Sequence, residues 1–143
     1  MALRFNAHQT TGNFNGVNAG SSVAGSTIFM GGSVFQKVGS LSAIVVVDIE
    51  TSTLTASASW EVSNDNSTWM DVAHASNNPA AVVLATGTAG ADPTITKVIP
   101  APDAVYGYKF ARIKVTMGVT NGTTNDTYTF GYSYRQLTGS EAR

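Results

Sequence analysis

The chain of 143 residues contains no cysteine and few charged residues. Without cysteine, disulfides, thiolate metal sites and cysteine nucleophiles are all excluded. Charged residues make up 12% of the chain, about half of the ~25% that is usual in globular proteins. The formal net charge is −1, so the sequence lacks the basic surface that nucleic-acid binding requires.

Three basic residues lie close together in the sequence, and their spacing fits an exposed strand. Lys109, Arg112 and Lys114 fall within the predicted strand region 104–119, where Arg112 and Lys114 share one face and Lys109 points to the other. This spacing is typical of a solvated strand face and not of a track for phosphate groups. We therefore expect no nucleic-acid partner.

Long apolar runs are also absent. No segment approaches the ~20 apolar residues of a membrane span, and residues 1–6 lack the apolar core of a signal peptide. We expect a chain that is synthesised in a cytoplasm, is not exported by the usual route and has no membrane partner.

What the chain does contain is β-strand patterning. Apolar residues occupy every second position between 54 and 62, with polar residues between them, which predicts a strand with one buried face. The polar turn 63–67 and the segment 68–72 follow, so we expect a hairpin with Trp60 in one arm and Trp69 in the other.

The remaining strands define the fold class. The uninterrupted apolar run at 43–47 predicts a central strand buried on both faces, and 81–85 is either a strand or one helical turn. Further strands are predicted over 27–30, 33–38, 41–49, 94–99, 104–119 and 128–135. Seven to nine strands without helices predict an all-β fold: a two-layer antiparallel β-sandwich, jelly-roll-like or immunoglobulin-like.

The first 26 residues differ in composition from the rest. Residues 1–26 are rich in Gly, Asn, Ser, Thr and Ala and show no periodicity, which predicts an extended N-terminal arm with little structure of its own. A single sandwich domain then covers 27–143. The arm is either a floppy tail or a segment that orders when it lies across a neighbouring subunit. In the second case its partner-binding residues would be Phe5, Phe14, Val17 and Val23.

The sequence offers little for catalysis. His8 lies in the predicted arm, and Asp71 faces the strand side opposite to His74, so neither histidine has an orienting partner. Asp48 and Glu50 share a strand face, and paired carboxylates can act as an acid–base pair or bind calcium. A strand end that enters solvent is the simpler explanation of the two residues. We expect no catalytic residue, no metal site and no cofactor, and hence no enzyme.

The sharpest local motif is the turn 63–69. It resembles the Asp-box hairpin turn of sialidase propellers, with Ser67 where glycine is expected and Trp69 one position early. One copy argues against a propeller, which repeats its motif. Asp65 and its asparagine neighbours suit a structural turn. The functional alternative is sugar stacking on Trp60 or Trp69.

The hairpin 60–69, with the closing strand 128–135, resembles small virion proteins of tailed bacteriophages, among them capsid decoration (cement) proteins. The likeness spans about residues 40–136. It implies a non-enzymatic protein that binds the outer surface of a phage capsid and bridges neighbouring capsid subunits. The implied partners are the major capsid protein and further copies of the chain, as a trimer or dimer on the particle.

Two other functions remain open. A carbohydrate-binding or host-adhesion module predicts at least one tryptophan exposed beside polar side chains. The cement function predicts both tryptophans buried in the sheet or at a protein interface. A tail or head-to-tail connector component is the third possibility, and the sequence does not separate it from cement.

Overall fold

Ten strands and one short 3₁₀ helix make up the described part of the computed structural model, which covers residues 2–17, 20–31, 36–48, 54–72, 82–87, 94–117, 123 and 125–138. In chain order the elements are β1 (Ala2–Asn13), β2 (Ser22–Ala24), β3 (Ile28–Phe29), β4 (Gln36–Asp48), β5 (Leu54–Ser63), β6 (Met70–Val72), β7 (Val82–Gly87), β8 (Thr94–Pro100), η1 (Asp103–Gly107), β9 (Phe110–Met117) and β10 (Thr127–Thr138).

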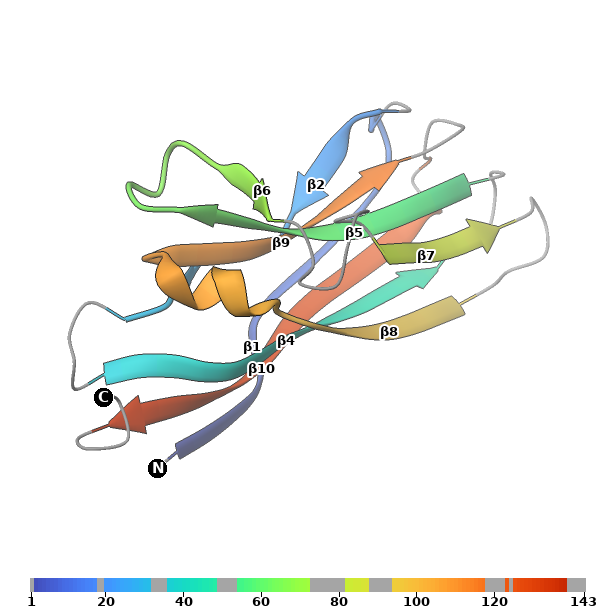
Figure 1. Ribbon diagram of the computed structural model, residues 1–143. Helices are drawn as coiled ribbons and strands as arrows, with labels where there is room; N and C mark the ends of the chain where they lie inside the picture. Colours follow the sequence, from blue (N-terminus) through green and yellow to red (C-terminus); the bar gives the residue numbers. More distant parts are fainter. Residues whose placement is uncertain are drawn as a thin grey trace.

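The strands form two antiparallel sheets that face each other (Figure 1). The four-stranded sheet has the order β1-β10-β4-β8. In the six-stranded sheet, β9 and β5 are the central pair. β2 and β3 follow one another along the far edge of β9, and β6 and β7 do the same along β5. The predicted all-β two-layer antiparallel sandwich is therefore confirmed.

The sheet order also separates the two sandwich types that the sequence left open. If β2 with β3, and β6 with β7, are counted as interrupted strands, each sheet holds four strands. The chain then crosses from one sheet to the other at every step except between β5 and β6. Two four-stranded sheets linked by such crossings are the jelly-roll architecture.

Strand β4 shows which face of the four-stranded sheet is covered. Ala43, Val45 and Val47 are buried between the sheets, whereas Ile44 and Val46 on the opposite face are only half-buried. The prediction that this run is buried on both faces is thus wrong for one face. In the described part of the chain no helix or strand lies against that outer face (Figure 1).

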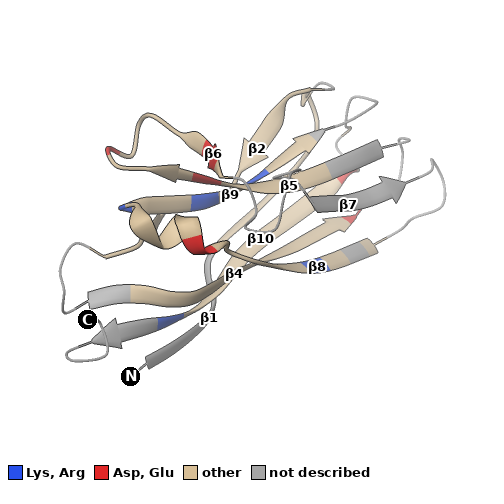
Figure 2. Ribbon diagram, viewed as in Figure 1, with Lys and Arg blue, Asp and Glu red and all other residues tan. Residues whose placement is uncertain are grey.

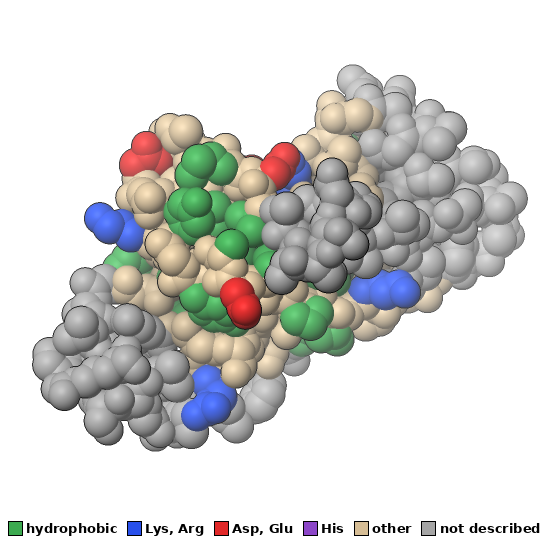
Figure 3. Space-filling model, viewed as in Figure 1, with side chains coloured by type: hydrophobic (Ala, Val, Ile, Leu, Met, Phe, Trp, Pro, Cys, Tyr) green, Lys and Arg blue, Asp and Glu red, His purple; other side chains and the backbone are tan. Residues whose placement is uncertain are grey.

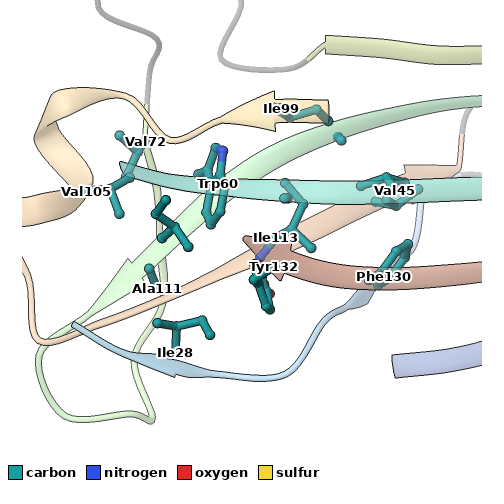
Figure 4. Close-up of a cluster of buried hydrophobic side chains, with 14 of the residues drawn as sticks. Ile28, Val45, Trp60, Val72, Ile99, Val105, Ala111, Ile113, Phe130 and Tyr132 are labelled. Atoms are coloured by element: carbon teal, nitrogen blue, oxygen red, sulfur yellow. Dashed lines mark hydrogen bonds between the residues drawn. The ribbon is translucent and has the colours of Figure 1, made fainter. Parts of the chain in front are cut away.

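The core between the sheets is built around large side chains from β5, β9 and β10. Trp60, Ile113 and Tyr132 lie together between the layers (Figure 4). Aromatic side chains of the last strand point inward, and Phe130 and Tyr132 are fully buried. The Trp60 and Tyr132 rings lie 5.9 Å apart between centroids in a tilted pair, an arrangement that aromatic rings favour.

The expectation of an unstructured N-terminal arm is wrong for the residues described. Residues 2–13 are β1, which pairs with β10, and residues 22–24 are β2, which pairs with β9. The pairing of β1 with β10 shifts register twice. Because each shift interrupts the alternation of side chains, no period of two runs through the segment, and the sequence pattern missed the strand.

Two further expectations need correction. The strands predicted separately over 33–38 and 41–49 are joined at Gly39 and Ser40, which lie inside β4. Ser40 has a φ of 51° and the pairing with β10 shifts register there, so this point is a bulge and not a strand end. The predicted strand 104–119 begins later, because residues 103–107 form η1. The Tyr106 hydroxyl accepts a hydrogen bond from the Leu41 backbone N–H (2.7 Å), which fastens η1 to β4.

The Tyr132 hydroxyl joins the two sheets through the backbone. Gly25 N–H donates to Ile113 C=O (2.8 Å), and in a regular antiparallel pair Ile113 N–H would return the bond to Gly25. Here Ile113 N–H donates to the Tyr132 hydroxyl (3.0 Å), which donates to Ser26 C=O (2.9 Å). A Cβ at Gly25 would come within 2.7 Å of this hydroxyl, so glycine makes room for the insertion.

Replacing this hydroxyl tests its contribution to stability. Tyr132→Phe leaves Ile113 N–H and Ser26 C=O without a partner in a buried site, which costs roughly 2–4 kcal/mol of unfolding free energy. Urea unfolding measures the loss. Tyr128→Phe on the same strand is the matched control, since no hydrogen bond joins its hydroxyl to the described residues. Equal stability of the two variants would contradict the account.

The same hydroxyl predicts a loss of stability in alkali. Burial raises the pKa of Tyr132 above its usual value of 10.0. Above pH 10 the unfolded chain therefore releases a proton that the folded chain keeps, so stability falls as pH rises and is fully present below that pH. Urea unfolding between pH 8 and pH 11 should show a shallower decline for Tyr132→Phe than for the wild type. Parallel declines would refute the assignment.

Candidate functional site

The described residues hold no assembled chemical centre. Among them, no three His, Asp or Glu side chains are placed to hold a metal ion. Asp48 closes β4, but Glu50 and His74 lie outside the described residues, as does the side chain of His8. The pairing of Asp48 with Glu50 therefore stays a prediction. No helix within the described ranges is long and apolar enough to cross a membrane.

Basic residues on β9 lie beside acidic residues on β5 and β6 in the six-stranded sheet (Figure 2). Arg112 on β9 forms an ion pair with Glu61 on β5 (Nε–Oε1, 3.5 Å), and Lys114 bonds Asp71 on β6 (Nζ–Oδ1, 2.6 Å). The Arg112 guanidinium also lies 4.0 Å from the Trp69 ring centroid. As predicted, Arg112 and Lys114 share a face, and their contacts hold three strands together.

The two tryptophans occupy different environments. Trp60 is 0% exposed, so it is a core residue and is not available for sugar stacking. Trp69 is half-buried, and the Arg112 guanidinium occupies one side of its ring, a cation–π contact. The structure therefore corrects the assignment of Trp60 and shows Trp69 engaged within the sheet.

The turn at Asp65 is stabilised by its own backbone. Asp65 Oδ1 accepts hydrogen bonds from the N–H groups of Ser67 (2.8 Å) and Thr68 (2.7 Å), and from the Ser63 hydroxyl (2.9 Å). The Thr68 and Ser67 N–H groups, followed by the Ser63 hydroxyl, lower the pKa of Asp65 from 3.8 to about 2. All of these bonds stay within residues 63–68, which is what a structural turn requires.

The predicted partner-binding residues mostly face the core. Phe14 is fully buried and packs on Tyr128, with ring centroids 5.0 Å apart. Val17 and Val23 are half-buried and pack against the same core. Phe14 is thus a core residue and offers no surface to a partner. The side chain of Phe5 lies outside the described residues, and its role stays a prediction.

The most distinctive surface of the structure is one that the sequence does not predict. Part of the solvent-facing side of the four-stranded sheet, named the outer face from here on, consists of three rows across β8, β4 and β10. The rows are Pro100–Ser42–Ser133, Val98–Ile44–Gly131 and Thr96–Val46–Thr129. No residue in these rows is charged, whereas the opposite sheet carries the ion pairs described above. The row that follows these three, Thr94–Asp48–Thr127, carries the Asp48 carboxylate.

Large apolar side chains are exposed at this sheet and at the adjoining edge. Val98 on β8 is 62% exposed, and Ile44 and Val46 are half-buried beside it. Met70 and Tyr106 are also exposed. Figure 3 shows hydrophobic side chains gathered over β6, η1 and β8, with few charges between them. Exposed apolar side chains gathered in this way are candidates for protein–protein contacts.

Comparison with known proteins adds little to this description. No protein-family model matches the chain, and no curated protein matches it. Among solved structures, the chain is similar to "Structure of infectious bursal disease virus Gx strain", with 12% sequence identity and a TM-score of 0.49. The match covers 97% of this chain and 32% of the viral chain, so this chain spans about a third of that chain's length. A likeness at this level assigns neither family nor function.

The lowered pKa of Asp65 predicts that the protein loses stability in acid, and the Asp65→Asn variant isolates this effect. Because its pKa is lowered to about 2, the Asp65 carboxylate stabilises the fold above pH 3.8, and this contribution is lost as pH falls towards 2. Asp65→Asn keeps an acceptor oxygen but cannot titrate. The difference in Tm between wild type and Asp65→Asn should shrink between pH 4 and pH 2. A difference that does not change with pH would rule out this role.

Proposed function

We propose that the chain is a non-enzymatic structural protein of a virus particle, which binds the outer surface of a phage capsid and bridges neighbouring capsid subunits. The observation that carries the proposal is the outer face. It combines Ile44, Val46 and Val98 with hydroxyl side chains, and its three rows carry no charge. Such a surface can be buried against another protein without leaving an unpaired charge in the interface.

The energetics of a particle suit a surface of this kind. A single contact through a few aliphatic side chains is weak, because binding must offset the loss of translational and rotational freedom. On a capsid the same contact repeats at each symmetry-related position, and a chain that touches two subunits gains from multivalency. Modest apolar surface is therefore sufficient to stabilise the assembly.

The fold and the resemblance support the same proposal. Double-sheet jelly rolls occur in capsid and lectin domains, although a fold alone does not assign a function. The likeness of residues 40–136 to phage virion proteins favours the capsid. The lectin alternative loses one of its two stacking residues, since Trp60 is buried.

A charge placed on the outer face tests the proposal. Val46→Lys puts an ammonium group on β4, the central strand of the contact surface, so we expect binding to empty capsids of the same virus to weaken at least about tenfold, a loss of roughly 1.4 kcal/mol. Co-sedimentation of purified protein with capsids measures the affinity. Thr116→Lys, which puts the same charge on the six-stranded sheet, should bind as the wild type does.

Two results would overturn the proposal. The first is capsid binding by Val46→Lys that equals that of Thr116→Lys, with both variants folded by circular dichroism. The second is binding of the wild type to purified tails or connectors and not to empty capsids, which would move the protein to another part of the particle.

A further inference from the structure

Strand β8 is an edge strand of the four-stranded sheet within the described part of the chain. Ala101 N–H donates to Leu41 C=O (2.9 Å), so the hydrogen-bonded pairs between β8 and β4 fall at odd-numbered residues of β8. The backbone groups of Thr94, Thr96 and Val98 then point away from β4. No described strand pairs with them.

The sequence of β8 fits an open edge that is available for pairing. Pro100 also lies on the outward-pointing register, where its missing N–H removes no bond to β4. The three residues before it in that register are β-branched and exposed, which favours extended backbone. A row of unpaired N–H and C=O groups on such residues is a template for a further strand.

The other edges of the sandwich are less suited to pairing. On the far side of the four-stranded sheet, β1 carries two register shifts, and bulges of this kind disrupt an edge. The edge strands β2, β3 and β6 are two or three residues long. The pairing of β7 with β5 also shifts register. β8 is the longest edge strand with an unbroken register among the described residues.

We propose that β8 pairs antiparallel with β8 of a second copy of this chain, on a two-fold axis that passes beside Thr96. In this register Thr96 lies opposite Thr96 of the second copy, and Thr94 lies opposite Val98 in both directions. All outward backbone groups of these three residues are then satisfied. The two outer faces join into one continuous surface across an eight-stranded sheet.

The position of Lys97 on β8 favours this pairing register over the adjacent one. With the axis beside Thr96, Lys97 lies opposite Ile95 of the second copy. Moving the axis by one residue, to Lys97, shifts the pairing by two residues and places Thr96 opposite Val98. Lys97 would then lie directly opposite Lys97 of the second copy, and Pro100 opposite Thr94. Like charges directly opposite destabilise a pair, and the proline would remove a hydrogen bond. The Thr96-centred pairing avoids both.

The dimer proposal can be tested separately from capsid binding, because its test uses the purified chain alone. Since the chain has no cysteine, a single introduced cysteine reports its own position. In the proposed register, Thr96→Cys brings the two Cα atoms to about 5.5 Å, within the range of a disulfide. Thr94→Cys leaves them four residues apart along the strand, roughly 14 Å.

Mild oxidation followed by non-reducing electrophoresis compares the two variants. We expect Thr96→Cys to form a covalent dimer and Thr94→Cys to remain monomeric. Equal cross-linking of both variants would overturn the register, and no cross-linking of Thr96→Cys would overturn the pairing.

Sedimentation equilibrium supplies a second test that needs no cross-link. Thr96→Lys puts two ammonium groups opposite each other on the axis, so the dimer Kd should rise roughly tenfold. Thr129→Lys makes the same change in the same row of the outer face but away from the edge, and its Kd should stay within about twofold of the wild-type value. A monomeric wild type would contradict the proposal and leave β8 to a strand from another protein. Equal weakening by both variants would also contradict it.

Discussion

The buried hydroxyl of Tyr132 is the contact on which the closure of the sandwich depends. It lies on β10 in one sheet and completes the backbone hydrogen bonding of Ile113 and Ser26 in the other. A buried N–H or C=O without a partner is costly, so the two sheets are held in one relative position. The Thr10 and Ser26 hydroxyl groups, 2.8 Å apart, add a second link from β1 to the same segment. The rest of the core packs within this frame.

The two sheets differ in the side chains that they present to solvent. The six-stranded sheet pairs its charges internally through Arg112 with Glu61 and Lys114 with Asp71. The four-stranded sheet has aliphatic and hydroxyl side chains in the three rows of its outer face, and β8 is its edge strand among the described residues. Ordered strands whose exposed side chains are mostly uncharged suit a protein that makes contact with other subunits, because little ordering entropy is lost on binding.

The sequence predicts the class of fold well and the surface poorly. The alternation at 54–62 and at 128–135 is strong because one face of each strand is buried and the other is polar. The run at 43–47 is different: its outward residues Ile44 and Val46 are aliphatic, so it reads as buried on both faces. The signal that corrects it lies on the neighbouring strands, where Thr96 and Thr129 occupy the same row. Strand order, which a single sequence does not contain, is needed to see this. The sequence does not reveal β1, because its register shifts remove the period of two. Without β1, Phe14 falls in a segment that has no visible core contacts, so the sequence does not predict its burial.

Hydroxyl-radical footprinting of the protein, free and bound to the capsid, tests the central claim most directly, because it reports the solvent exposure of individual side chains. We predict that Ile44, Val46 and Val98 lose reactivity on the particle while Phe29, which is 54% exposed beside the six-stranded sheet, keeps it. Loss of reactivity at Phe29 with Ile44 and Val46 unchanged would contradict the claim that the outer face is the surface through which this protein acts.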